Sequence, residues 1–222
     1  MSKTAVITGC NRGIGLELTR ELVADGYNVI GLCRTPSEKL LALENVKVIE
    51  GVDLSAGPGV SNAVESLAGL QIDLLINNAG ILRSSSLESF DRSLLEEQFL
   101  VNAVAPIELT ARLFPQINSG GKVAMVTSRM GSIADNGSGG AYGYRMSKSA
   151  LNAGCMSLAL DLKAREIAVA ILHPGWVQTE MTGHTGHIKP DESASLLMQR
   201  IRELSLETSG TFWHANGEVL PW

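Results

Sequence analysis

The sequence is poor in several features that would assign it to a broad class. Its 222 residues include only three cysteines, Cys10, Cys33 and Cys155. Their odd number and wide spacing indicate free thiols in a reducing compartment rather than a disulfide framework. No apolar run approaches the roughly 20 residues of a membrane-spanning helix, and the first residues lack the apolar segment of a signal peptide. We therefore expect a cytoplasmic protein.

The sequence also lacks an excess of basic residues. It has 18 Lys and Arg against 23 Asp and Glu, a net charge of −5, whereas nucleic-acid-binding proteins usually carry a basic face. With 45% hydrophobic residues, a chain of this length can bury a core as a single unit. We predict one domain over residues 1–222, with a small molecule as its partner and neither a nucleic acid nor a membrane.

Short apolar runs alternate with helical patterns along the whole chain. The runs expected to form strands are 5–8, 27–33, 46–50, 73–76, 122–127 and 167–173, with a weaker one at 211–213. This alternation predicts a doubly wound α/β fold, with a central parallel sheet of about seven strands and helices on both faces. Residues 182–190 leave the apolar pattern, and we expect them to form a mobile lid over the substrate.

A glycine-rich turn, TGCNRGIG at residues 8–15, follows the first expected strand and opens an amphipathic helix. Such a turn lies at the carboxyl edge of the sheet, where ligands bind. Gly9, Gly13 and Gly15 would let a phosphate approach the backbone, and the N-terminus of the helix would attract it. The spacing is neither G-x-G-x-x-G nor a G-x-x-x-x-G-K-[ST] loop. Taken alone, it also fits a turn that merely packs a helix on a strand.

Two arginines indicate which dinucleotide the turn would take. Folds that bind NAD usually place an acidic residue after the second strand, to bond the ribose 2′-hydroxyl. Here that position is occupied by Arg34, and Arg12 lies inside the glycine turn. Guanidinium groups suit a 2′-phosphate, so we expect NADP(H). The alternative is that both arginines are ordinary solvated side chains.

Tyr144 and Lys148 are four residues apart, so on one helix they share a face. A phenol has an unperturbed pKa of about 10, and a neighbouring ammonium is expected to lower it. Such a phenol could protonate the oxygen of a carbonyl that is being reduced. Tyr142 is the rival, but Met146 stands four residues after it. The pairing therefore favours Tyr144.

Asn102 lies in a helical pattern, and Pro106 stands four residues later. Because proline has no N–H, a continuous helix would kink there and free the carbonyl of Asn102. A buried asparagine could also simply satisfy a neighbouring polar group.

These features together resemble the short-chain dehydrogenase/reductase family, from Thr8 to about Met181. The resemblance rests on TG-xxx-GIG, NNAG at 77–80, the Tyr–Lys pair and HPGWVQTEM at 173–181. The ending GTFWHANGEVLPW is similar to the branch of C-factor and sniffer-type carbonyl reductases. The resemblance implies a Rossmann fold and transfer of a hydride between NADP(H) and a small carbonyl or alcohol.

The resemblance also implies catalytic roles. Tyr144 would be the proton donor, Lys148 would bind the nicotinamide ribose, and Ser128 would bond the substrate carbonyl. Asn102 would hold a water of the proton relay. Ser132, 12 residues before Tyr144, competes with Ser128, which is 16 before it. We favour Ser128 because the end of a strand is a rigid platform.

Further residues would bind the cofactor by resemblance. Asp53 would contact the adenine, although it could also cap a helix, and Val177 and Thr179 would bond the carboxamide. The full expected set is Gly9, Asn11, Arg12, Gly13, Ile14, Gly15, Arg34, Asp53, Leu54, Asn77, Asn78, Ala79, Gly80, Tyr144, Lys148, Pro174, Gly175, Val177 and Thr179. We predict no metal site, since His184 and His187 have no carboxylate or cysteine placed to complete one.

Two functions from different classes follow. The first is an NADPH-dependent reductase of ketones or aldehydes, or the reverse alcohol oxidation. The alternative is a dinucleotide-binding signalling protein of the C-factor type with little turnover. A sensor has no need of a phenol beside an ammonium, so the sequence favours the enzyme. The resemblance further implies a homo-oligomer, dimer or tetramer, formed through the helices that carry Asn102 and Tyr144.

Overall fold

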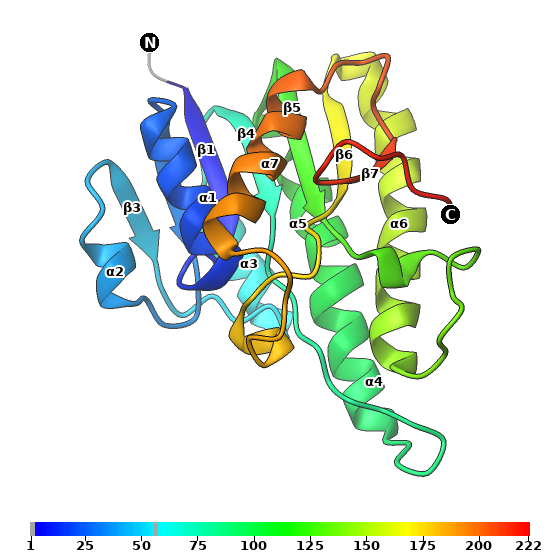
Figure 1. Ribbon diagram of the computed structural model, residues 1–222. Helices are drawn as coiled ribbons and strands as arrows, with labels where there is room; N and C mark the ends of the chain where they lie inside the picture. The colour runs from blue at the N-terminus through cyan, green and yellow to red at the C-terminus, as the bar shows by residue number, and fades with distance from the viewer. Residues whose placement is uncertain (1–2, 56) are drawn as a thin grey trace.

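A seven-stranded sheet forms the centre of the computed structural model, which describes residues 3–55 and 57–222 (Figure 1). All neighbouring strands pair in parallel, in the order β3-β2-β1-β4-β5-β6-β7. The strands are β1 (Thr4–Thr8), β2 (Asn28–Leu32), β3 (Val46–Ile49), β4 (Ile72–Asn77), β5 (Ile117–Val126), β6 (Ala168–His173) and β7 (Phe212–His214).

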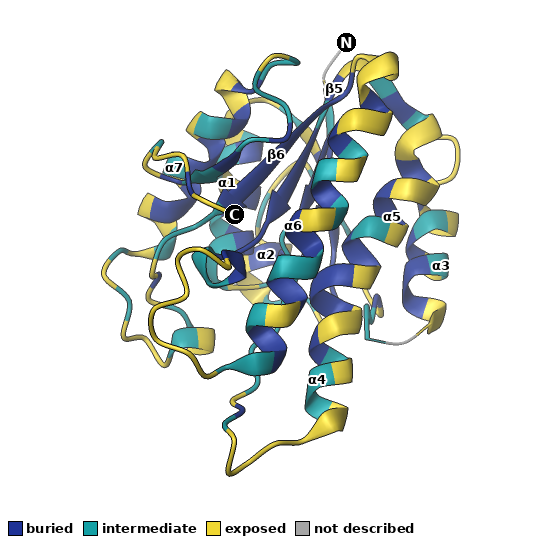
Figure 2. Cartoon of the chain, turned by 90° about the vertical axis from the view of Figure 1, so that its right-hand side faces the viewer, coloured by how far each residue is buried: buried dark blue, intermediate teal, exposed yellow. Residues whose placement is uncertain are grey.

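Helices cover both faces of this sheet. The helices are α1 (Gly13–Ala24), α2 (Glu38–Leu41), α3 (Gly57–Ser66), α4 (Arg92–Phe99), α5 (Ala105–Leu113), α6 (Tyr142–Leu162) and α7 (Pro190–Glu203). Figure 2 shows α3, α5 and α6 side by side over one face, with their buried sides toward the sheet. The opposite face is covered by α1 and α7. The predicted doubly wound Rossmann fold is therefore confirmed.

The strands are apolar because each of their faces meets a layer of helices. On β1, Val6 packs in the cluster under α3, α5 and α6, whereas Ala5 and Ile7 pack in the cluster under α1 and α7. Side chains alternate between the two faces of a strand, so a strand covered on both sides reads as a continuous apolar run. Within the described residues, no helix is long and apolar enough to cross a bilayer.

The topology determines where a ligand can bind. The chain leaves β1 toward β2 on one side, while β4 lies against β1 on the other. This change of direction opens a crevice at the carboxyl ends of β1 and β4, where doubly wound folds bind their ligands. Thr8, Asn77, Val126 and His173 end their strands at this edge.

The expected strands agree with the observed ones to within one residue at each end, except for the start of β5. β5 begins at Ile117, five residues before the expected start, and Ile117 pairs with Ile72 of β4. The register shifts between Ile72 and Leu74, so the glycine pair Gly120 and Gly121 lies in an irregular part of the strand. Glycines and an irregular register hide the apolar pattern of a strand. The sequence therefore predicted only its second half.

Candidate active site

A groove of about 770 Å³ runs along the carboxyl edge of the sheet. It extends from the glycine turn, past the ends of β2 and β3, to the N-terminal part of α6 and the segment that follows β6. Of the residues expected from the sequence, it is lined by Gly9, Asn11, Arg12, Gly13, Ile14, Gly15, Arg34, Asp53, Leu54, Asn78, Ala79, Gly80, Tyr144, Lys148, Pro174 and Thr179. Residues from six separate motifs thus meet in one continuous groove.

The glycine turn forms one wall of the groove and is held by the NNAG turn. The Asn78 side chain donates to the carbonyls of Thr8 and Gly9, each at 3.1 Å. Gly9 has φ +67°, and a Cβ there would lie 2.9 Å from Ala79 Cα. The glycine is therefore needed both for its backbone conformation and for the close approach of the two turns.

The N-terminus of α1 opens onto this groove. The residue before the helix, Arg12, makes no side-chain hydrogen bond to the first turn. The N–H groups at the start of the helix have no side-chain cap from Arg12, and together with the helix dipole they favour an anion. This end of the groove can thus hold a phosphate.

Asp53 and Arg34 both line the far side of the groove. Asp53 Oδ1 accepts from Ser55 N at 3.0 Å and from Ser55 Oγ at 2.7 Å. These bonds lower the pKa of Asp53, and the nearby Arg34 guanidinium lowers it further. Asp53 therefore remains charged. Its bonds to Ser55 stabilise the turn before α3, and Asp53 also lines the groove.

Tyr144 and Lys148 lie at the other end of the groove, on successive turns of α6. Both are buried, with 8% and 3% of their surfaces exposed, and Lys148 Nζ is 5.9 Å from the centre of the Tyr144 ring. Lys148 Nζ donates to Val126 O at 2.9 Å, which ties α6 to the end of β5. Burial lowers the pKa of Lys148 to about 8.

The pKa of Tyr144 differs from the expectation. Burial raises the pKa of Tyr144 above its ordinary value, and a hydrogen bond with Ser128 acts in the opposite direction. The expected lowering of the Tyr144 pKa is wrong as a net shift, because the loss of solvent around the phenol outweighs the influences that favour the phenolate. At neutral pH the phenol therefore carries its proton.

Ser128 and Ser132 are both buried, but their hydroxyls have different partners. Ser128 contacts Tyr144, and its Oγ accepts from Met130 N at 3.1 Å. Ser132 Oγ instead accepts from Asp135 N at 3.0 Å, within its own turn. The structure thus brings Ser128, and not Ser132, to the tyrosine.

Asn102 lies behind Lys148, where the helix is interrupted. Between α4 and α5, residues Leu100–Val104 form a π-helical segment, which agrees with the irregularity expected from Pro106. Asn102 Oδ1 accepts from Ile81 N at 2.8 Å, and its Nδ2 donates to Ile81 O at 2.8 Å. A Cβ on Gly80 would lie 3.2 Å from Asn102 Oδ1 and 3.6 Å from Lys148 Nζ. Asn102 therefore holds the segment after NNAG close to the lysine.

Five expected residues do not line the groove directly: Asn77, Asn102, Ser128, Gly175 and Val177. Asn77 is buried, and its Nδ2 donates to Thr110 Oγ1 at 3.1 Å, which joins β4 to α5. Val177 is also buried, and its carbonyl accepts from Thr182 Oγ1 at 2.6 Å. Their hydrogen bonds stabilise the walls of the groove from behind.

The expected lid, residues 182–190, is bonded back onto the segment before it. Trp176 Nε1 donates to Thr185 O at 2.8 Å, and Gln178 N donates to Ile188 O at 2.9 Å. Val177 and Ile188 also form a parallel bridge. Residues 176–188 thus form one hydrogen-bonded unit beside the groove, and its movement as a lid stays a prediction.

The sequence analysis missed several residues that line the groove, namely Arg83, Glu97, Gln178, Glu180, Met181 and His184. Arg83 and Glu97 form a two-bond ion pair, at 3.0 and 3.1 Å, between the segment after β4 and α4. Only the folded chain brings these two together. Glu180 directly follows Thr179 of the recognised motif, so its position in the sequence could have indicated it.

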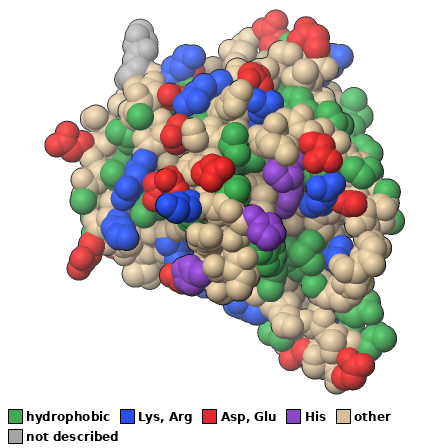
Figure 3. All heavy atoms as spheres, in the orientation of Figure 1, with side chains coloured by type: hydrophobic (Ala, Val, Ile, Leu, Met, Phe, Trp, Pro, Cys, Tyr) green, Lys and Arg blue, Asp and Glu red, His purple; other side chains and the backbone are tan. Residues whose placement is uncertain are grey.

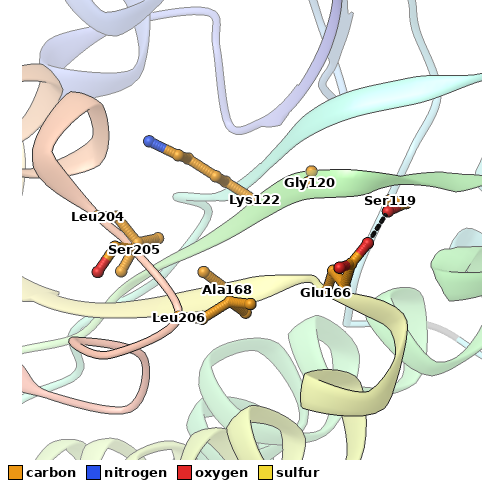
Figure 4. Close-up of a pocket in the computed structure, with 9 residues that line it drawn as sticks. Ser119, Gly120, Lys122, Glu166, Ala168, Leu204, Ser205 and Leu206 are labelled. Atoms are coloured by element: carbon orange, nitrogen blue, oxygen red, sulfur yellow. Dashed lines mark hydrogen bonds between the residues drawn. The ribbon is translucent and has the colours of Figure 1, made fainter.

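A second hollow, of about 300 Å³, lies near the opposite edge of the sheet. Figure 4 shows its wall residues. Ser119 and Glu166, which are hydrogen-bonded to each other, lie on one side, and residues 204–206 lie on the other. Lys122 Nζ donates to the carbonyls of Ile201 and Arg202, at the end of α7. Here the charged groups already have partners within the protein, so this hollow shows no sign of a ligand site.

Comparisons with known proteins agree with this geometry. A relative from Rhodococcus sp. (strain AD45), "1-hydroxy-2-glutathionyl-2-methyl-3-butene dehydrogenase", is 34% identical over 225 residues and covers 99% of both chains. The carbonyl reductase Sniffer of D. melanogaster superposes with a TM-score of 0.91 at 29% identity and covers 100% of both chains. An NADPH-bound carbonyl reductase from chicken fatty liver gives 0.89 at 28% identity, over 100% of this chain and 99% of that one.

The family model that matches is that of the short chain dehydrogenases, over residues 3–189. The match contains the glycine turn, the NNAG turn, the Tyr144–Lys148 pair and the segment after β6, which are the parts that form the groove. The chain belongs to the short-chain dehydrogenase/reductase family of oxidoreductases.

Proposed function

We propose that this protein is an NADPH-dependent reductase of ketones and aldehydes, which also oxidises the corresponding alcohols in reverse. The observation that carries the proposal is the cluster of Ser128, Tyr144 and Lys148 at one end of a groove whose other end contains Arg12 and Arg34. The carbonyl reductases among its structural neighbours support the same reaction class.

The groove fits an extended dinucleotide. The open N-terminus of α1 suits the pyrophosphate, and Arg34 beside Asp53 suits the adenosine with its 2′-phosphate. Pro174 and Thr179 border the end near Tyr144, where the nicotinamide would lie. When bound there, NADPH would supply the hydride for the carbonyl carbon.

Tyr144 provides the proton. Since burial raises its pKa, the phenol is protonated at neutral pH and can donate to the oxygen of the substrate as negative charge develops on it. Ser128, hydrogen-bonded to the same phenol, would orient the carbonyl oxygen. In this role the raised pKa is useful, because a phenolate would have no proton to give.

Lys148 and Asn102 would support the proton donor from behind. Below its pKa of about 8, Lys148 is a buried ammonium that stabilises the phenolate left after proton transfer. One of its hydrogen bonds goes to Val126 O, and others are available to the ribose hydroxyls of the cofactor. Asn102, which holds Ile81, places the NNAG segment beside this lysine and would hold a water that passes protons to solvent.

Exposed apolar side chains on the helices that carry Asn102 and Tyr144 also support the expected homo-oligomer. Phe99, Leu100, Val104, Met146 and Leu160 are exposed on α4, the π-helical segment and α6. An apolar surface of this kind is typical of contacts between subunits. We keep a dimer or tetramer as part of the proposal, and light scattering of the purified protein measures it.

The test is NADPH consumption with a panel of reactive ketones and aldehydes, using wild type, Tyr144→Phe and the matched control Tyr142→Phe. We expect Tyr144→Phe to lower kcat by roughly 10²–10⁴-fold, the range of general acid catalysis, while NADPH still binds. Tyr142→Phe should keep its activity. Turnover that survives in Tyr144→Phe would contradict the mechanism. Tight NADPH binding without reduction of any carbonyl would instead favour the dinucleotide-binding signalling protein.

A further inference from the structure

One of the two arginines expected to bind the 2′-phosphate already has a carboxylate partner. Arg12 Nη1 forms an ion pair with Glu180 Oε2. The pair joins the glycine turn to the segment that follows β6, 168 positions apart in the chain. Both side chains remain largely exposed, at 63% and 62%, so water and ligands can reach them.

The backbone around both residues keeps this carboxylate within reach of Arg12. A Cβ on Gly13 would lie 3.4 Å from Thr179 Cγ2, so the glycine turn and the segment after β6 are in contact at the neighbouring positions. Glu180 begins a 3-10 turn, and Thr182 Oγ1 of that turn accepts from Thr179 N at 3.1 Å. Glu180 is therefore held at the mouth of the groove by structure that does not depend on the ion pair.

The other carboxylates of the groove have partners other than Arg12 and Arg34. Asp53 is bonded to Ser55, Glu97 to Arg83, and Glu17 lies 3.7 Å from Arg20. Across residues 3–55 and 57–222, no carboxylate forms an ion pair with Arg34. Of the two cations, Arg34 thus has no competing carboxylate among these residues, whereas Nη1 of Arg12 is already bonded to one. Figure 3 shows acidic and basic side chains interspersed over the face seen there.

We propose that Glu180 is a specificity-determining residue, whose carboxylate competes with the 2′-phosphate of NADPH for Arg12 and so weakens the preference for NADPH over NADH. This inference rests on the proposed function, in which the groove takes a nicotinamide dinucleotide. NADH has no 2′-phosphate, so it binds without disturbing the pair of Arg12 and Glu180. An NADPH that uses Nη1 of Arg12 must displace the carboxylate of Glu180.

The experiment measures dissociation constants for NADPH, NADH, 2′,5′-ADP and 5′-ADP with wild type and Glu180→Gln. Exposed ion pairs are weak, so we expect NADPH and 2′,5′-ADP to bind about two- to fivefold more tightly to Glu180→Gln. NADH and 5′-ADP should bind as they do to wild type. The gain should shrink at high ionic strength, because salt screens exposed charges.

A matched control is Glu203→Gln, which removes the carboxylate of another exposed ion pair, that with Arg200 at the end of α7. It should leave all four constants unchanged. The double variant Arg12→Gln/Glu180→Gln should lose the gain that Glu180→Gln shows alone, because the two effects act through one contact.

Three results would overturn the inference: unchanged NADPH binding in Glu180→Gln, weaker NADPH binding, or an equal gain for NADPH and NADH. The proposed function is tested separately by the wild-type protein. If wild type does not prefer NADPH to NADH, the proposed cofactor is wrong. The comparison of 2′,5′-ADP with 5′-ADP still tests whether Glu180 acts on a 2′-phosphate.

Discussion

Two lysines contact different parts of the fold, Lys122 within β5 and Lys148 on α6 beside the last residue of β5, and the protein uses them differently. Lys122, near the beginning of the regular part of the strand, is half-buried and donates to the carbonyls of Ile201 and Arg202 at 2.7 and 2.9 Å. Lys148 is fully buried beside the last residue of the strand and donates to Val126 O at 2.9 Å. In both cases burial lowers the pKa of the ammonium.

The two ammonium groups differ in how many hydrogen-bond donors they have used within the described part of the protein. Lys122 binds the C-terminal carbonyls of α7, where the helix dipole favours a cation, so its charge serves the stability of the fold. An ammonium has three donors. In the part of the chain that the structure describes, Lys148 spends one of them on Val126. A buried charge with unused donors lowers stability, which is typical of a functional residue.

The largest expected effect comes from Lys148→Met. Removing the ammonium beside Tyr144 should lower kcat for carbonyl reduction by about 10²-fold or more, since the phenolate formed by proton transfer loses its stabilising charge. The free energy of unfolding at pH 7 should stay the same or rise, because a buried cation is lost. Steady-state kinetics and urea denaturation measure the two quantities.

The pH dependence of the wild type sharpens this prediction. The Lys148 pKa of about 8 means that the ammonium is present below pH 8 and is lost above it. We expect kcat/KM for reduction to be flat below pH 8 and to fall above it, and the guanidinium of Lys148→Arg to delay the fall if that variant is active. A decline that begins only near pH 10 would show that Lys148 does not govern the reaction.

His173, the last residue of β6, is a second titratable group that is largely buried at the carboxyl edge of the sheet. Its ring meets that of His214 edge to face at 4.9 Å, and among the residues that the structure describes its buried Nδ1 has no hydrogen-bond partner. Burial lowers the pKa of His173 to about 3, and the nearby His214 and Arg129 act in the same direction.

The low pKa of His173 makes the stability of the fold depend on pH. The unfolded chain binds this proton below its ordinary pKa of about 6.5, whereas the folded chain does not until about 3. The contribution of neutral His173 to the free energy of unfolding is therefore fully present above pH 6.5, and it is lost as the pH falls toward 3. His173→Phe should match wild type at pH 8 and be more stable by about 1–2 kcal/mol at pH 5. Equal pH profiles in denaturation experiments would contradict this.

The smallest effect is expected from Lys122→Met, at the other end of the sheet. It removes two hydrogen bonds to carbonyls at the end of α7, and its half-exposed position limits the loss to about 1 kcal/mol of unfolding free energy. The values of kcat and KM should remain within about twofold of wild type. A large loss of activity in Lys122→Met would contradict the assignment of Lys122 to stability and of Lys148 to the reaction.

The sequence was a good guide wherever a residue's role depends on its own segment. The strands were predicted because each apolar run is covered on both faces, and Tyr144 and Lys148 because four residues make one helical turn. The TG-xxx-GIG and NNAG turns were predicted to lie together at one edge, and Asn78 does bond Gly9.

The sequence was a poor guide where a side chain's state depends on distant parts of the chain. The pKa of Tyr144 was predicted in the wrong direction, because the burial that raises it comes from the packing of whole layers. The partner of Arg12 is 168 positions away, and no local pattern indicates it. The hydrogen bonds that join residues 182–190 to Trp176 and Gln178 have no sequence signal, and the movement of this segment as a lid stays a prediction.

The hydrogen-bonded unit of residues 176–188 has a thermodynamic consequence for binding. A loop that becomes ordered only when a ligand arrives loses about 1–2 kcal/mol of conformational entropy per residue at that moment. Here the backbone bonds between Gln178 and Ile188, and between Trp176 and His187, form within the protein itself. The entropy is lost on folding rather than on association, so more of the contact energy of the cofactor can appear as affinity.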